Sequence, residues 1–231
     1  MKKYLTREEL RVRSEQLIDN PVERVPICIC ICAGKEITAY EEQKLNTGIN
    51  TLIQSLCENE DTVDAAEICI IVASDGEVQV MNEFMTTDYY KNAITVKAVG
   101  KSNTPAGLEM ALNKLEERVE EYKYYQRGYY QPWLIVLCKG NEEQHGVLGR
   151  LSDKLQRKIE GRHINMVPVA LDQEARTYLE SISKNGKVYS LADMKYDAFF
   201  EWIAKSAESM SASLSGAMQV EIPTQSWEEF F

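Results

Sequence analysis

The sequence lacks several features that would fix a location or a chemistry at once. It contains no apolar stretch near the ~20 residues that a membrane-spanning helix needs. Its first segment, MKKYLTREELRVRSEQL, is charged throughout and has no apolar core of the kind found in secretory signals. We therefore expect a cytoplasmic protein without membrane association.

Positively charged residues are fewer than negatively charged ones. Lysine and arginine number 26 against 36 aspartates and glutamates, so the formal net charge is 26 − 36 = −10. A surplus of this sign repels phosphate backbones, which makes general nucleic-acid binding unfavourable. No internal repeat or low-complexity linker divides the 231 residues, so one large domain is the simplest expectation.

Cysteines are few but concentrated, and none of the six forms a C-x-x-C pair. The run VPICICICAGKE at 25–36 alternates Cys28, Cys30 and Cys32 with isoleucine. Such a run could hold a metal or a redox site, but sulfurs at strand spacing are widely spread for one tetrahedral ion. Buried, reduced thiols that act as small hydrophobes are the favoured interpretation. Cys32 ends this run and could approach Cys138, so a thiol role for that pair stays open.

Apolar runs and amphipathic segments alternate along the chain. Expected strands are 27–32, 68–73, 78–80, 93–99, 133–138, 164–171 and 187–191. Two expected helices begin at Thr38 and at Thr104, and Thr104 is the expected cap of the second. Three further helices are expected at 148–159, 173–183 and 196–214. This alternation predicts an α/β fold with a Rossmann-like, doubly wound, mostly parallel sheet and helices on both faces. Ligands of such sheets bind at the carboxyl ends of the strands.

Four segments in this order resemble a known family. They are RVPICICICAGKEI (24–37), GKSNTPAGLEMAL (100–112), PWLIVLCKG (132–140) and FFEWIAKSAESMSASLS (199–215). Together they resemble von Willebrand factor A (vWA) domains of the bacterial intracellular type associated with tellurium-resistance and stress operons. The resemblance implies a vWA-like domain at 24–215, preceded by an N-terminal helical segment at 1–23 and followed by an acidic, aromatic tail at 216–231.

The resemblance also implies where a metal would lie. In the family an Asp-x-Ser-x-Ser loop, a Thr and a second Asp surround Mg²⁺ in a metal-ion-dependent adhesion site (MIDAS). Here the first Asp position is Cys32, the two Ser positions are Gly34 and Glu36, and the second Asp position is Lys139. Thr104 alone is kept. Because a thiol, a glycine and an ammonium are poor Mg²⁺ ligands, we expect a degenerate MIDAS without metal or other cofactor.

Lys139 could itself replace the lost ion. We expect its ammonium to lie among the loops and to pair with Glu36, with Thr104 hydrogen-bonded beside them. A lysine that simply points into solvent is the alternative.

The leading functional interpretation is a non-catalytic protein–protein interaction module. Relatives of this type are encoded beside protein kinase and phosphatase domains, so the resemblance implies a phospho-signalling or stress-response partner. The alternative is an α/β enzyme with a pocket at the strand ends, lined by Cys32, Glu36, Asp75, Thr104 and Lys139.

Two aromatic segments are candidates for partner contact. Tyr129 and Tyr130 belong to a stretch that interleaves tyrosines with Lys and Arg, a composition suited to protein interfaces or to stacking on nucleic acid. The net charge favours protein, and a plain helix end is equally compatible. In the tail, Trp227, Phe230 and Phe231 are expected to be docking anchors, with disorder as the alternative.

Overall fold

The computed structural model describes residues 5–74, 76–90, 92–140, 148–183, 187–191 and 195–212, with the backbone alone at 148–150. Its elements follow in the order α1 (Arg7–Asp19), β1 (Val25–Cys32), α2 (Ala39–Glu58), β2 (Ala66–Ser74), β3 (Glu77–Asn82), the 3₁₀ turn η1 (Thr87–Tyr89), α3 (Thr104–Tyr124), β4 (Trp133–Cys138), α4 (Leu148–Glu160), β5 (Asn165–Ala170), α5 (Gln173–Ile182), β6 (Tyr189–Ser190) and α6 (Tyr196–Ser211).

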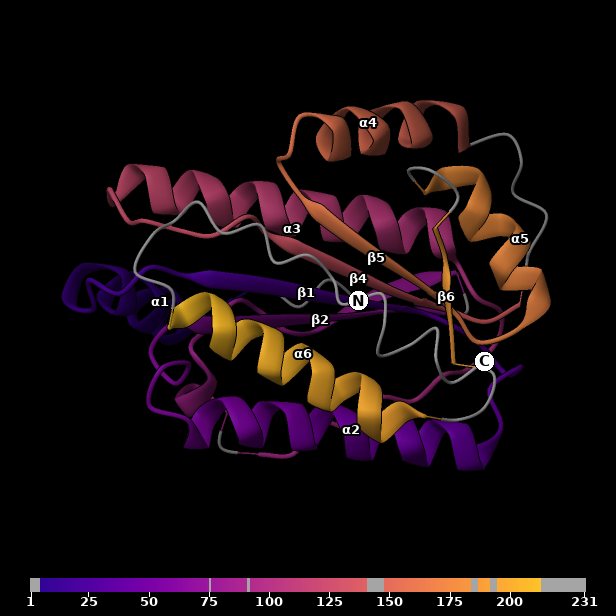
Figure 1. Cartoon of the computed structure of the whole chain (residues 1–231), viewed down its shortest axis with the longest axis horizontal. Helices are drawn as coiled ribbons and strands as arrows, with labels where there is room; N and C mark the ends of the chain where they lie inside the picture. Colours follow the sequence, from indigo (N-terminus) through magenta and orange to yellow (C-terminus); the bar gives the residue numbers. More distant parts are fainter. Residues whose placement is uncertain are drawn as a thin grey trace.

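The strands form one sheet in the order β3-β2-β1-β4-β5-β6. The edge strand β3 is antiparallel to β2, and the other pairs are parallel. Helices α3, α4 and α5 lie on one side of the sheet, and α2 and α6 lie on the other (Figure 1). The expected α/β architecture with a mostly parallel, doubly wound sheet is therefore confirmed.

Strand β1 explains the alternating cysteines. All eight of its residues are buried, as expected of a central strand covered on both faces. Its isoleucines belong to the core that packs under α2 and α6, whereas its cysteines face α3. The core on the α3 side contains five thiols, those of Cys28, Cys30, Cys32, Cys69 and Cys138. They are buried in the manner of small hydrophobes, as the sequence favours.

Glycines allow two helices to pack closely. A Cβ atom at Gly107 of α3 would lie 2.7 Å from the Cβ atom of Ala73 in β2. A Cβ atom at Gly48 of α2 would lie 2.1 Å from the ring of Phe200 in α6. Both distances are far below van der Waals contact, so these positions accept no side chain without a shift.

The segment at 93–99 differs from the prediction, because it is not a strand. Two asparagines of α2 supply the hydrogen bonds that a neighbouring strand would supply. The Asn46 side chain bonds to both the N–H (2.7 Å) and the C=O (2.9 Å) of Val96. Asn50 holds Ile94 in the same way, with both distances 2.8 Å. Val96 is buried and Val99 is 54% exposed, and side chains satisfy the backbone of Ile94 and Val96.

The start of α3 is a smaller correction. The cap is Asn103 instead of Thr104, since the Asn103 side chain accepts from the N–H of Ala106 at 3.4 Å. Thr104 is the first helical residue, which frees its hydroxyl for contacts with the sheet.

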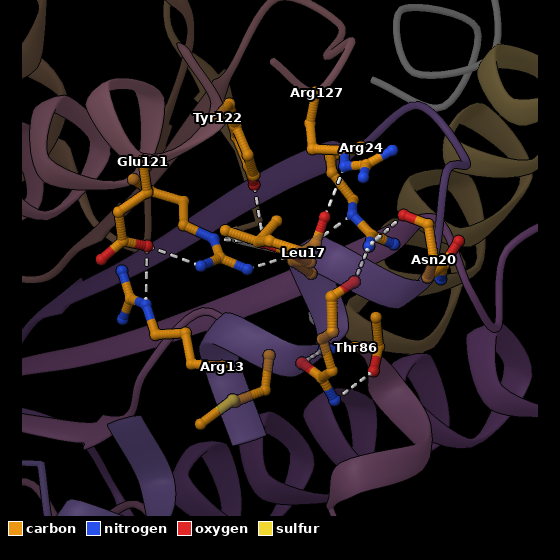
Figure 2. A network of polar contacts seen from close by, with 12 residues as sticks. Arg13, Leu17, Asn20, Arg24, Thr86, Glu121, Tyr122 and Arg127 are labelled. Carbon is orange, nitrogen blue, oxygen red and sulfur yellow. Dashed lines mark hydrogen bonds and ion pairs between the residues drawn. The ribbon is translucent and has the colours of Figure 1, made fainter. Parts of the chain in front are cut away.

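Two arginines from outside α1, Arg24 and Arg127, bind the C-terminal end of this helix and hold it against the domain. Arg24 donates from Nη2 to the carbonyl oxygens of Gln16 (2.6 Å) and Asn20 (3.2 Å). Arg127 donates to the carbonyl oxygens of Leu17 and, at 2.9 Å, Ile18. Figure 2 shows both guanidiniums reaching toward these carbonyl groups. Because the last carbonyls of a helix lack partners within it, these contacts replace a C-terminal cap.

Candidate functional site

The carboxyl edge of the sheet brings together the ends of β1 and β4. Cys32 and Cys138 are partners in the strand register, so the expected proximity of these two residues is confirmed. The Thr104 hydroxyl lies 3.4 Å from the Cys138 sulfur, and the Cys30 sulfur lies 3.5 Å from that of Cys32. Of these residues, Cys32 and Thr104 occupy positions that the resemblance assigns to a MIDAS.

The thiols of Cys32 and Cys138 are buried and remain protonated. Cys32 has no exposed surface, and its hydrogen bond with Cys30 together with burial raises its pKa well above the ordinary value. Burial likewise raises the pKa of Cys138, with a smaller effect from Cys32. A thiol becomes a nucleophile or a metal ligand through its thiolate. Both groups are therefore unreactive in this geometry.

The loop after β1 closes on itself. The backbone N–H of Gly34 donates to the Glu36 carboxylate at 3.1 Å, and the N–H of Lys35 donates to the carbonyl oxygen of Gly100 at 2.8 Å. A Cβ atom at Gly34 would lie 2.3 Å from that same oxygen. The two loops are thus in direct backbone contact, and Glu36 is turned back onto its own loop.

Lys139 pairs with Glu41, and the expected pair with Glu36 is wrong. The Lys139 ammonium lies 2.6 and 2.7 Å from the two carboxylate oxygens of Glu41, and the two side chains are 14% and 13% exposed. Glu41 lies in the first turn of α2, where it also accepts from the backbone and hydroxyl of Thr38. Burial alone would raise the pKa of Glu41, but the bonds from Lys139 and Thr38 hold it below the ordinary value.

A third carboxylate at this edge, that of Asp172, was not singled out in the sequence. Asp172 caps α5 with one oxygen, which accepts from the N–H of Ala175 at 2.8 Å. Its other oxygen accepts from the N–H of Gly140 at 2.8 Å. Both oxygens therefore serve the backbone, and they fix the loop after β4 to the start of α5.

This set of groups does not fit a Mg²⁺ site, which requires an octahedron of oxygen ligands. The edge offers buried thiols, a glycine, an ammonium and carboxylates already bound to N–H groups or to Lys139. Within the described ranges, no cluster of three or more His, Cys, Asp or Glu side chains is arranged to hold a metal ion.

The aromatic residues predicted to contact a partner differ in burial. Tyr130 is 6% exposed and belongs to the core, where its backbone N–H donates to the carbonyl oxygen of Arg24 at 2.8 Å. Tyr129 is half-buried, and its ring stacks on Tyr122 with centroids 5.2 Å apart. The other predicted residues lie outside the described part of the chain: Asp75, Trp227, Phe230 and Phe231.

A buried ionic cluster at the opposite end of the sheet escaped the sequence reasoning. Glu67, in β2, accepts from Arg118 at 2.6 and 2.7 Å and from the Tyr122 hydroxyl at 2.6 Å, and its carboxylate lies 3.5 Å from Arg24 Nε. Figure 2 shows Tyr122 and Arg24 converging on this cluster. One signal was available: Arg118 lies in the apolar stripe of its helix, between Leu115 and Tyr122.

None of the described helices combines the length and apolar character needed to span a bilayer. No protein-family model matches the sequence. No curated protein matches it either.

Solved structures do resemble the chain. Proximal thread matrix protein 1 from the mussel byssus is 16% identical with a TM-score of 0.57, covering 82% of this chain and 47% of its own. The pilus adhesin SpaC from Lactobacillus rhamnosus GG is 12% identical with a TM-score of 0.60, covering 81% and 30%. The VWA domain of SpRpn10 is 9% identical with a TM-score of 0.51, covering 73% and 87%.

This chain thus spans less than half the length of the first two structures and most of the third. The mussel protein has also been solved with zinc in its MIDAS motif. Identities this low establish the fold alone. The strand order, the helix layers and the matched structures together show that this chain has the fold of a von Willebrand factor A domain.

Proposed function

We propose that this chain is a non-catalytic protein-interaction module whose vWA fold works without a metal ion. The observation that carries the proposal is the ion pair of Lys139 with Glu41. Lys139 occupies the position that the resemblance assigns to the second metal-binding Asp. Its ammonium adds a positive charge to an edge where a MIDAS would collect oxygen ligands for a cation.

The rest of the edge supports the same proposal. The loops that a shared Mg²⁺ would hold together are joined here by backbone hydrogen bonds between Lys35 and Gly100 and between Lys139 and Cys32, at 2.8 and 3.1 Å. Direct contacts of this kind stabilise the loops without an ion.

The chemistry of the edge argues against the enzyme alternative. Cys32 is fully buried with a raised pKa, so it is a poor nucleophile. Both carboxylate oxygens of Glu41 bind the Lys139 ammonium, so this group is already engaged in an ion pair. Glu36 accepts from the Gly34 N–H at 3.1 Å, so its carboxylate is engaged within its own loop.

The proposed contact surface is the exposed rim of this edge. Lys35 is exposed at the tip of the loop after β1, and Tyr40, at the start of α2, is 52% exposed. Tyrosine is enriched at protein interfaces because it offers a large rigid ring with a polar tip. By the resemblance to stress-operon proteins, the partner would belong to a cytoplasmic bacterial stress or tellurium-resistance system and would be associated with a kinase or phosphatase.

Site-specific photo-crosslinking tests this proposal. The full chain would carry p-benzoylphenylalanine at Tyr40, and a matched chain would carry it at Tyr124, which is 80% exposed on the C-terminal turn of α3. In the native host we expect one discrete protein adduct from Tyr40, competed by unlabelled protein, unchanged in EDTA and absent from Tyr124. The purified partner should then bind the wild-type chain in EDTA, and Lys35→Glu should weaken binding.

Two results would contradict the proposal. An adduct that disappears in EDTA and returns with Mg²⁺ would show that the edge works through a metal. Turnover of a substrate by the purified chain, abolished by Lys139→Met but retained in a variant with equal loss of stability, would favour the enzyme.

A further inference from the structure

The end of α4 places an arginine in a left-handed backbone conformation. The N–H of His163 donates to the carbonyl oxygen of Lys158 at 2.8 Å, and the N–H of Arg162 donates to that of Ile159 at 3.0 Å. This pair of bonds is the Schellman motif, whose left-handed position normally holds glycine. Here Arg162 occupies it with φ 56°, although Gly161 is its direct neighbour. Glycine would accept this conformation without strain, so the position keeps its arginine at a cost in free energy.

Arg162 lies at the rim of a cavity of about 420 Å³ between α3 and the end of α4. Its side chain is exposed and forms no ion pair with any residue that the structure describes. The rim also carries Lys123 and Lys158, against the carboxylates of Glu116 and Glu120. Three cations against two carboxylates make this a locally positive site on a chain of net charge −10. The free guanidinium is the group best placed to attract an anion.

The floor of the cavity is apolar. It is formed by Leu112, Leu115, Val119, Pro132 and Ile164. The half-buried ring of Tyr129 adds an aromatic wall, which makes this predicted interface residue part of the site. A concave apolar floor with a few charged groups at its rim suits a ligand that combines aromatic or aliphatic bulk with negative charge.

We propose that this cavity binds residues 227–231 of the same chain. That segment, WEEFF, places Glu228 and Glu229 between Trp227 and Phe230–Phe231, so it has both the bulk and the charge that the cavity requires. Residues 213–231 lie outside the described part of the chain, and their sequence alone supplies this half of the argument.

The connection is long enough. Trp202 of α6 stacks on Trp133 with ring centroids 5.6 Å apart, and Trp133 directly follows Pro132 of the cavity floor. The described chain ends at Ala212, which leaves 227 − 212 = 15 residues to reach Trp227. Fully extended, they span up to roughly 50 Å, about the full diameter of a compact domain of this size.

Fluorine NMR of the full chain with 5-fluorotryptophan tests the proposal, because the three tryptophans give one resonance each. The Trp227 resonance, assigned with Trp227→Phe, should be shifted from that of the free peptide TQSWEEFF and shielded from a soluble paramagnetic agent. Arg162→Glu should raise the solvent-exposed population of Trp227 about twofold to fivefold, as expected for a surface charge contact. The resonances of Trp133 and Trp202 should stay in place, which verifies that the variant is folded.

Two further variants separate binding from structure. Arg162→Gly should release Trp227 while raising the midpoint of thermal unfolding, since glycine accepts φ 56° without strain. Lys35→Glu, a matched charge reversal at the opposite edge, should leave Trp227 shielded. Combining Arg162→Glu with Glu228→Arg should restore shielding in part.

Three outcomes would overturn the proposal. The first is a Trp227 resonance in the wild-type chain that coincides with that of the free peptide. The second is a shielded Trp227 that is insensitive to both Arg162 variants. The third is shielding that grows with protein concentration, which would assign the segment to a second copy of the chain.

Discussion

Replacing Glu67 by Gln tests how far the fold depends on its buried ionic cluster. The substitution keeps the shape of the side chain and removes its charge. Arg118 and Arg24 would then remain with no exposed surface and without the carboxylate that faces both of them. The Tyr122 hydroxyl, which donates to Glu67 at 2.6 Å, could still bond to the amide oxygen.

The magnitude follows from the burial of these groups. Removing one partner of a buried ion pair costs about 3–5 kcal/mol, since the remaining charge is uncompensated. Arg118 also donates to Glu121 at 2.6 Å, and this second carboxylate places our expectation at the lower end, about 3 kcal/mol. A domain has about 5–15 kcal/mol of stability in total, so Glu67→Gln should remain folded but with a clearly lower urea midpoint. Glu15→Gln is the control: Glu15, 47% exposed and paired with Arg11, should cost less than about 1 kcal/mol.

The same cluster predicts a pH dependence. Burial alone would raise the pKa of Glu67, but the charge and hydrogen bonds of Arg118, with contributions from Tyr122 and Arg24, hold it below the ordinary value of 4.5. A carboxylate with a lowered pKa in the folded state stabilises the fold above its unfolded pKa, and this contribution is lost as the pH falls through the folded value. Wild-type stability should therefore decline below pH ~4.5, and that decline should be smaller in Glu67→Gln.

Urea unfolding followed by circular dichroism, at pH 7 and in steps from pH 6 to 3, measures both effects. Our reasoning fails if Glu67→Gln costs no more than Glu15→Gln at pH 7. It also fails if Glu67→Gln loses as much stability on acidification as the wild type and Glu15→Gln do, because Glu67 would then titrate like an exposed carboxylate.

Four other expectations concern the carboxyl edge and the packing beneath it. Thermal melts in millimolar Mg²⁺ and in EDTA should coincide, and a reproducible rise with Mg²⁺ would contradict the absence of a metal site. Lys139→Met should cost about 1–3 kcal/mol by stranding Glu41, and adding Glu41→Gln should cost clearly less than the sum of the single changes; additive losses would mean that the pair does not interact. A disulfide reagent such as DTNB should modify Cys57 alone in the native protein, because the other five thiols are buried; a second rapidly modified thiol would show that the sheet opens. Gly107→Ala should cost about 1–3 kcal/mol, since the new Cβ atom would lie 2.7 Å from that of Ala73, and an unchanged urea midpoint would refute this close approach of α3.

Local patterns in the sequence determined most of the secondary structure. The run VPICICIC predicts a strand buried on both faces because apolar side chains on alternate sides need cover on both sides. The capping box of Thr38 and Glu41 fixes the start of α2 through contacts three residues apart. Alternating strands and helices then restrict the fold to a parallel sheet with two helix layers, and the carboxyl ends of β1 and β4 must share one edge.

Contacts between distant residues were decided by the tertiary structure alone. Lys139 could have met Glu36 or Glu41, and the choice rests on the Gly34 N–H, which holds the Glu36 carboxylate against its own loop. The segment at 93–99 has the composition of a strand. Its backbone groups, however, bond to the side-chain amides of Asn46 and Asn50 in α2 and not to another strand. Likewise, Glu67 lies 51 residues from Arg118 in the chain, and a lone charge in an apolar run does not identify its counter-charge. Sequence periodicity records which side of an element is buried, whereas a charge or a hydrogen-bonding group is satisfied by whichever partner the packed chain brings within about 3 Å.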